Sequence, residues 1–142
     1  MRTMANIKLS FDGSCGPINP GGTAGYGYVI YVDSKEFARK SAEIGTGPSF
    51  SNNYAEFFAV YKGLERIAEF AKPLDYINVI GDSQLVIQIL KKRWRAKSGL
   101  YYPAYVLASS ELQKLRQKDV AVVFDWVPRE ENTLADQLSK NI

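Results

Sequence analysis

Residues 77–90 read INVIGDSQLVIQIL, and this stretch decides the fold class. It begins as a short apolar run rich in β-branched residues, which is typical of a strand buried between other strands. The Gly-Asp pair at 81–82 ends this run, and an aspartate in that position can cap a helix. We therefore predict a strand over 75–81 that leads directly into a helix over about 83–92, as in a strand–helix–strand crossover.

The chain before this stretch has the pattern of an antiparallel meander. Residues 6–12 alternate apolar and polar side chains, as a strand with one buried face does. The Gly- and Pro-rich segment 16–22 has the composition of a turn. Two further strands, 24–33 and about 35–45, follow with a tight turn near Asp33. Together these segments predict a meander of three strands.

The remaining elements are helices and one more strand. Apolar residues recur at helical spacing from Ser51 until Pro73, and further helices are predicted over about 103–118 and from about Glu130. A strand over 120–127 precedes the last helix. This order predicts an α/β fold of mixed α+β character, with one five-stranded mixed sheet and helices on both faces. No repeat or linker interrupts the 142 residues, so we expect a single domain.

The composition excludes several classes of site. The chain has no histidine, which excludes Ser-His-Asp and Cys-His catalysis and imidazole zinc sites, so a metal would have oxygen ligands, as magnesium, manganese and calcium do. Cys15 is the only cysteine, which rules out an intrachain disulfide and fits a reducing compartment. We see neither the apolar core of a signal peptide nor the roughly 18 apolar residues of a membrane span, and we expect a cytoplasmic protein without membrane contact.

The net charge of +3 is concentrated in the segment KKRWRAK at 91–97. The segment contributes five positive charges and no acid, and the remaining 13 basic and 15 acidic residues give −2. A local basic patch suits a polyanion better than it suits general solubility. The alternative is a solvated loop whose Trp94 belongs to the core.

Four acids stand at the ends of predicted elements: Asp12, Glu56, Asp82 and Asp136. Acids at strand ends can converge in space, and converging carboxylates repel one another unless a hard divalent cation sits among them. If Asp12 ends the strand beside the one that Asp82 follows, the two carboxylates come within reach of one metal. Glu56 can then supply a third ligand from the helix that packs over them.

Each of these acids also has a purely structural interpretation. Asp12 begins an Asp-Gly pair, which is common in turns. Glu56 lies three residues after Asn53 and could complete a capping box. Asp82 could cap the following helix, and Asp136 could be a solvated acid on an amphipathic helix. The case for a metal site rests on the four acids occurring together.

The motifs FDGS at 11–14, SNNYAE at 51–56, GDSQ at 81–84 and ENTLAD at 131–136 resemble those of type 1 ribonuclease H. Their order and the predicted elements match that family from about residue 6 to residue 140. The resemblance implies a nuclease that cleaves the RNA strand of RNA–DNA hybrids, leaving 5′-phosphate and 3′-hydroxyl ends. It also implies two magnesium ions, for which manganese could substitute. The implied catalytic residues and metal ligands are Asp12, Glu56, Asp82 and Asp136.

The resemblance also implies a set of substrate contacts. Asn19, Asn53 and Gln84 match groups that contact the minor groove of the hybrid, where an amide can recognise the 2′-hydroxyl. Ser51 and Asn52 match the pocket for a phosphate of the DNA strand. The basic segment matches the family's basic protrusion, with Lys91, Lys92, Arg93, Trp94, Arg95 and Lys97. Asn19 could instead be a turn former and Ser51 a helix cap.

One departure from the family pattern concerns the loop before the last helix. Many members carry a histidine there, whereas this chain has none, and Arg129, Glu130 or Glu131 could take over part of its role. Two other functions remain open on the same fold: a nucleic-acid-binding module that does not cut, and a different metal-dependent nuclease such as a Holliday-junction resolvase or an exonuclease. We expect a monomer without an obligate protein partner.

Overall fold

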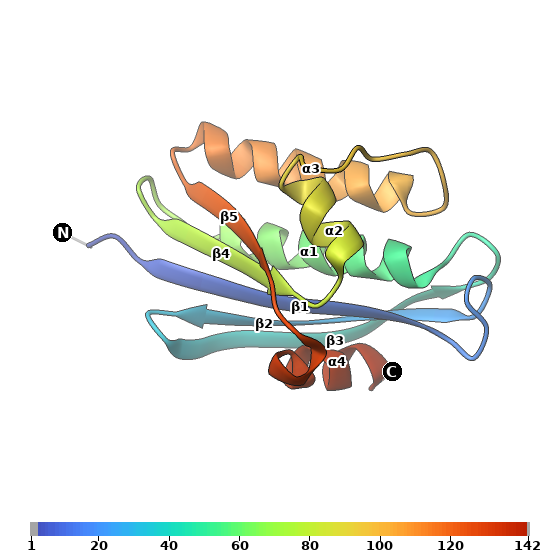
Figure 1. The fold of residues 1–142 in the computed structure, drawn as a ribbon. Helices are drawn as coiled ribbons and strands as arrows, with labels where there is room; N and C mark the ends of the chain where they lie inside the picture. Colours follow the sequence, from blue (N-terminus) through green and yellow to red (C-terminus); the bar gives the residue numbers. More distant parts are fainter. Residues whose placement is uncertain (1–2, 142) are drawn as a thin grey trace.

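The computed structural model describes residues 3–141 and contains one five-stranded sheet of order β3-β2-β1-β4-β5 (Figure 1). Its strands are β1 Asn6–Gly16, β2 Thr23–Val32, β3 Lys35–Thr46, β4 Tyr76–Gly81 and β5 Ala121–Trp126. β1, β2 and β3 are antiparallel, whereas β4 is parallel to both β1 and β5. The predicted meander and mixed sheet are confirmed.

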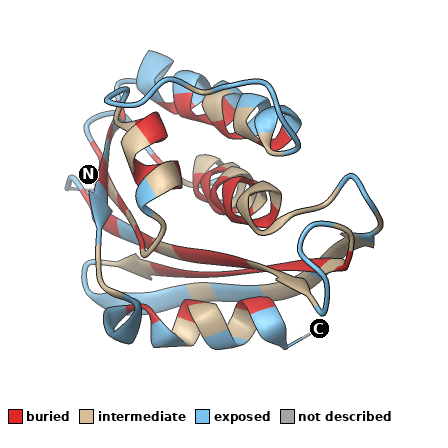
Figure 2. Ribbon diagram, turned by 45° about the vertical axis from the view of Figure 1, so that its right-hand side comes forward, coloured by how far each residue is buried: buried red, intermediate tan, exposed pale blue. Residues whose placement is uncertain are grey.

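The helices lie on both faces of this sheet, as predicted (Figures 1 and 2). They are α1 Asn52–Ala68, α2 Gln84–Leu90, α3 Tyr102–Gln117 and α4 Thr133–Lys140. α1 packs against β1 and β2 with α3 beside it, and α4 packs against the same two strands from the opposite face. Within residues 3–141, no helix has the length and apolar character that a membrane crossing requires.

The core lies between the sheet and α1. Ile7, Leu9 and Phe11 alternate along β1 on the face toward α1, where all three are buried beside Phe57 and Leu64 of that helix. Figure 2 shows the buried residues concentrated on α1 and the central strands. The side chains that alternate with Ile7, Leu9 and Phe11 along β1 point to the opposite face of the sheet, which carries α4. These residues are Lys8, Ser10 and Asp12.

Three boundaries differ by three residues or more from the sequence-based expectation. α1 ends at Ala68 rather than just before Pro73, because the backbone N–H groups of Glu69 and Phe70 bond three residues back, to Arg66 and Ile67. The last helix begins at Thr133 rather than near Glu130, because residues 129–131 form a short 3₁₀ helix and Asn132 has a non-helical backbone. Asp12 lies inside β1 rather than at its end. The parallel pairing of β1 with β4 stops at Ser10, but the antiparallel pairing with β2 continues to Gly16.

Candidate active site

Asp12 and Asp82 meet where the parallel pairing of β1 with β4 ends. Ser10 pairs with Ile80, so the residues two positions further along each strand lie level with one another. Asp12 is 6% exposed, and Asp82 directly follows β4. The carboxyl ends of neighbouring parallel strands thus bring the two acids together, as the sequence predicts.

Glu56 joins them because Gly13 lets α1 approach β1. A Cβ atom at Gly13 would collide with the backbone at Ala55 and Glu56. The first turns of α1 therefore rest directly on the β1 backbone next to Asp12. Glu56 is 8% exposed, and its electrostatic interactions with Asp12 and Asp82 confirm the proximity.

Asp136 approaches from the opposite face of the sheet because of a second glycine. Gly27 pairs directly with Asp12, and a Cβ atom there would lie 2.6 Å from the Leu138 Cβ and 2.8 Å from the Ala135 carbonyl oxygen. Backbone contact between α4 and β2 at this point places Asp136 against Asp12. The Asp12 carboxyl hydrogen-bonds the Asp136 carboxylate.

Substituting Gly27 tests this packing. We expect Gly27→Ala to lower the free energy of unfolding by about 1–3 kcal/mol, because the added methyl group overpacks the contact with α4. We also expect nuclease activity to fall by more than the loss of folded protein would explain, since α4 carries Asp136. Urea unfolding and cleavage assays would measure both effects. Gly99→Ala is the matched control, because a Cβ there has no neighbour within 4 Å. Unchanged stability of Gly27→Ala would contradict the proposed close approach.

The acids of the site differ in pKa. Burial raises the pKa of Asp12 to about 8, with further contributions from the charge of Asp82, the hydrogen bond to Asp136 and the charge of Glu56. Burial likewise raises the pKa of Glu56 to about 7, although a hydrogen bond with Ser83 opposes the rise. Burial also favours a higher pKa for Asp136, but hydrogen bonds from Lys140 and Asp12 outweigh it and leave the pKa of Asp136 below its ordinary value.

Two cations and an amide complete the surroundings of the acids. Arg129 Nε lies 3.6 Å from Asp82 Oδ2, and Lys140 Nζ lies 3.1 Å from Asp136 Oδ1. The buried Asn132 donates from Nδ2 to the Phe11 carbonyl oxygen at 2.9 Å and to Asp82 Oδ1 at 3.4 Å. Asn132 therefore ties the loop before α4 to β1 and to Asp82.

The donor set fits a hard divalent cation. The four acids offer only carboxylate oxygens, which magnesium and manganese prefer, and Glu56 Oε2 is buried without a hydrogen-bond partner. Among residues 3–141, no three His, Cys, Asp or Glu side chains are already arranged as a metal-holding group. Arg129 and Lys140 instead neutralise part of the charge, and a cation among the acids would require the side chains to move.

The predicted contacts at the start of α1 adjoin one another. Ser51 caps α1 by accepting a hydrogen bond from the Tyr54 backbone at 3.1 Å, which is the structural role left open by the sequence. Asn19 Oδ1 accepts from the Asn52 backbone at 2.9 Å, so the turn after β1 is fastened to α1. Asn53 follows in the first turn of the helix and is partly exposed.

Gln84 and the basic segment belong to a second group, on α2 and the loop that follows it. Gln84 opens α2, and its side chain accepts a hydrogen bond from Gln88. Trp94 is 49% exposed, so the interpretation of Trp94 as a core residue is wrong. A cleft of about 440 Å³ lies along the loop. Its exposed polar and aromatic lining consists of Lys92, Arg93, Trp94, Arg95 and Tyr102.

The cations of the basic segment are not equally available. Lys91 lies 4.0 Å from Asp125, and Lys92 contacts the Tyr105 hydroxyl at 3.1 Å. In the described part of the chain, Arg93, Arg95 and Lys97 form no ion pair, and all three are exposed. These three residues are the free positive charges of the loop.

Comparison with known proteins identifies the family. The model of the family described as reverse transcriptase-like matches residues 10–142. The chain is 28% identical over 137 residues to the bifunctional protein Rv2228c of Mycobacterium tuberculosis, covering 95% of this chain but only 35% of that protein. It thus spans about a third of the length of the mycobacterial relatives.

Solved structures show the same fold. The N-terminal RNase H domain of Rv2228c matches with a TM-score of 0.81 at 29% identity, over 96% of this chain and 92% of that one. RNase H1 from the archaeon Halobacterium salinarum matches with a TM-score of 0.81 at 30% identity, over 96% of both chains. LC11-RNase H1, solved in complex with an RNA/DNA hybrid, matches with a TM-score of 0.80 at 24% identity, over 95% and 94%. The chain belongs to the reverse transcriptase-like family and has the fold of type 1 ribonuclease H.

Proposed function

We propose that the chain is a ribonuclease H that hydrolyses the RNA strand of RNA–DNA hybrids with magnesium as cofactor. The observation that carries the proposal is the convergence of three other acids, Glu56, Asp82 and Asp136, on Asp12, with both Asp12 and Glu56 buried. Such crowding of carboxylates is costly unless the site binds a cation. The ribonuclease H names of the relatives support the same reaction.

The proposed ligands of the metal are the four acids: Asp12, Glu56, Asp82 and Asp136. When bound, a pair of magnesium ions would stabilise the attacking and leaving oxygens of a phosphodiester displacement. Ser83 would orient Glu56, and Asn132 would orient Asp82, through the hydrogen bonds described above. Arg129 and Lys140 are largely exposed and can leave the acids as a cation enters.

The proposed hybrid contacts divide into two groups. Asn19 and Asn53 lie where the turn after β1 meets α1, and with Gln84 they offer amides to 2′-hydroxyl groups. Ser51 and Asn52, at the same place, are the proposed contacts to a phosphate of the DNA strand. Arg93, Arg95 and Lys97 offer free charges to phosphates, with Trp94 exposed between them. Phosphate contacts supply affinity, whereas the amides supply the distinction between RNA and DNA.

The direct test is cleavage of three labelled substrates, with and without magnesium: an RNA–DNA hybrid, double-stranded RNA and duplex DNA. We expect cleavage of the RNA strand of the hybrid alone, and only with magnesium. Binding of the hybrid without any cleavage would instead indicate the non-cutting module. Cleavage of duplex or branched DNA would indicate a different nuclease on the same fold.

Neutralising the free cations of the basic segment tests the role of that segment. We expect the triple variant Arg93→Gln, Arg95→Gln, Lys97→Gln to weaken binding to hybrids of every sequence alike. The slope of log K against log salt should lose up to about 0.9 per phosphate contact removed. Fluorescence anisotropy across a salt series would measure it, with Lys72→Gln, Lys118→Gln as the control at the opposite end of the sheet. An unaltered salt slope would show that the segment is a solvated loop that does not contact the hybrid.

A further inference from the structure

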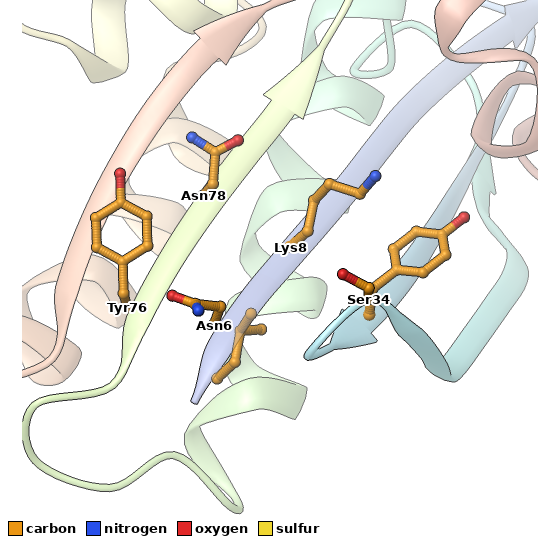
Figure 3. Close-up of a pocket in the computed structure, with 7 residues that line it drawn as sticks. Asn6, Lys8, Ser34, Tyr76 and Asn78 are labelled. Carbon is orange, nitrogen blue, oxygen red and sulfur yellow. The ribbon is translucent and has the colours of Figure 1, made fainter. Parts of the chain in front are cut away.

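A second cavity lies on the part of the sheet that α4 leaves open (Figure 3). It has a volume of about 420 Å³. That volume falls in the range of small-molecule and nucleotide sites. Its polar and aromatic lining comes from β1, β2, β4 and the β2–β3 turn, and consists of Asn6, Lys8, Tyr31, Ser34, Tyr76 and Asn78.

Sheet register explains why these side chains share one face. Lys8 pairs directly with Tyr31 on β2 and with Asn78 on β4, and Asn6 pairs with Tyr76. Paired residues on neighbouring strands point to the same side of a sheet. Figure 3 shows Asn6 and Lys8 rising between Tyr76 and Asn78 on one side and Ser34 on the other. The strands thus present two tyrosine rings on either side of a lysine.

Several polar groups of this cavity are unused by the fold. The Lys8 ammonium lies 4.5 Å from the centroid of the Tyr31 ring and, within residues 3–141, makes no ion pair. Tyr76 is 39% exposed, although most other tyrosines pack within the core. In the same part of the chain, the side chains of Asn6 and Ser34 have no hydrogen-bond partner. The Asn78 amide, by contrast, donates to Asp125 Oδ2 at 2.7 Å. An exposed cation, the exposed ring of Tyr76 and the free Asn6 amide therefore remain available to a ligand, and the half-buried Tyr31 ring becomes available once Lys8 moves away from it.

This combination matches single-stranded nucleic acid. Bases stack on exposed aromatic rings, a lysine neutralises a phosphate, and an amide has the donor and acceptor that a base edge requires. The two tyrosines stand two strands apart and are offset by two residues along the strands, so they are roughly 12 Å apart, and two unpaired bases of one strand could reach both. A duplex keeps its base faces stacked internally and cannot use such a platform. The lining also offers no exposed aliphatic cluster of the kind that protein interfaces bury.

The cavity and the candidate active site lie on the same face of β1. Lys8, Ser10 and Asp12 alternate on the same face of that strand, and Asp12 lies about 13 Å from Lys8 at the usual rise per residue. A nucleic-acid strand bound at both places would therefore lie on one face of the sheet.

We propose that the open face of the sheet around Lys8, Tyr31 and Tyr76 is a binding site for single-stranded nucleic acid, distinct from the basic segment. Bases stack on the two tyrosines, and Lys8 moves from the Tyr31 ring to a phosphate. The proposal rests on the proposed function only in the class of its ligand, because binding here needs neither metal nor cleavage.

The test measures binding of a fluorescein-labelled oligonucleotide of about 12 thymidines by anisotropy, in EDTA and low salt. We expect the double variant Tyr31→Ala, Tyr76→Ala to weaken binding at least about ten-fold. The variant Tyr31→Phe, Tyr76→Phe should retain binding, because stacking needs the ring and not the hydroxyl. The exposed Phe37→Ala on β3 is a control for loss of an aromatic side chain elsewhere.

Each other outcome overturns the proposal. Equal binding by the alanine and phenylalanine double variants would exclude the tyrosines as a stacking platform. Loss of binding only in the Arg93→Gln, Arg95→Gln, Lys97→Gln variant would assign the oligonucleotide to the basic segment. A concentration-dependent dimer abolished by Tyr76→Ala would assign the face to a second copy of the chain. Failure of hybrid cleavage with magnesium, by contrast, bears only on the proposed function.

Discussion

Asp12→Asn is expected to reduce hybrid cleavage by about 10³-fold or more while leaving the fold and hybrid binding intact. Asp12 is the acid that the other three surround, and loss of its charge removes several kcal/mol of interaction with a divalent cation. The asparagine preserves the local contacts. Its Oδ1 can still accept from the Gly13 backbone, as Asp12 does at 2.9 Å, and its amide can donate to Asp136 in place of the carboxyl.

Single-turnover cleavage at saturating magnesium, together with hybrid binding in EDTA, separates catalysis from affinity. Asp119→Asn is the matched control, because this exposed aspartate has a φ of 65°, which asparagine tolerates, and lies at the opposite end of the sheet. Wild-type turnover in Asp12→Asn would rule out the assignment of the metal site. Loss of binding and activity together would mean that Asp12 supports the fold instead.

Periodicity in the sequence was enough to predict the elements and their order. The alternation of Ile7, Leu9 and Phe11 and the run at 77–81 follow directly from burial on one or both faces of a sheet. The boundaries of the elements were harder to predict. No residue near Glu130 indicates that the last helix cannot begin there. The helix begins later because Asn132 hydrogen-bonds to Phe11, which lies 121 residues earlier in the chain.

The acids could be predicted as a group, but not the means by which they are brought together. Gly13 and Gly27 are ordinary strand or turn glycines by sequence, and only the fold shows that each lets a helix touch the backbone beside Asp12. Asn132 likewise has no sequence signal, since its partners are distant. The ion pair of Lys140 with Asp136 could have been predicted, because Lys140 stands four residues after Asp136 on the same helix face.

The metal-free protein is expected to lose stability as the pH rises from about 5 to about 8. Unfolded Asp12 and Glu56 ionise near pH 4, whereas in the fold their pKa values are about 8 and about 7. Between these limits the folded state binds more protons than the unfolded state, so the free energy of unfolding falls with pH. Asp136, with its lowered pKa, acts oppositely but only below about pH 4. We expect a loss of at least about 3 kcal/mol, since each pKa unit corresponds to about 1.4 kcal/mol.

Magnesium should reverse this loss, because the cation and the protons compete for the same carboxylate oxygens. At a concentration 100-fold above its dissociation constant a ligand adds about 2.7 kcal/mol of stability, and this gain should be larger at pH 8 than at pH 6. Urea unfolding in EDTA and in magnesium across this pH range would measure both effects. No histidine is present to add its own titration. Asp12→Asn should remove most of the pH slope and most of the response to magnesium. If stability in EDTA stays flat from pH 5 to pH 8, or if magnesium stabilises equally at both ends, the four carboxylates do not form the crowded, cation-binding cluster on which the proposed function depends.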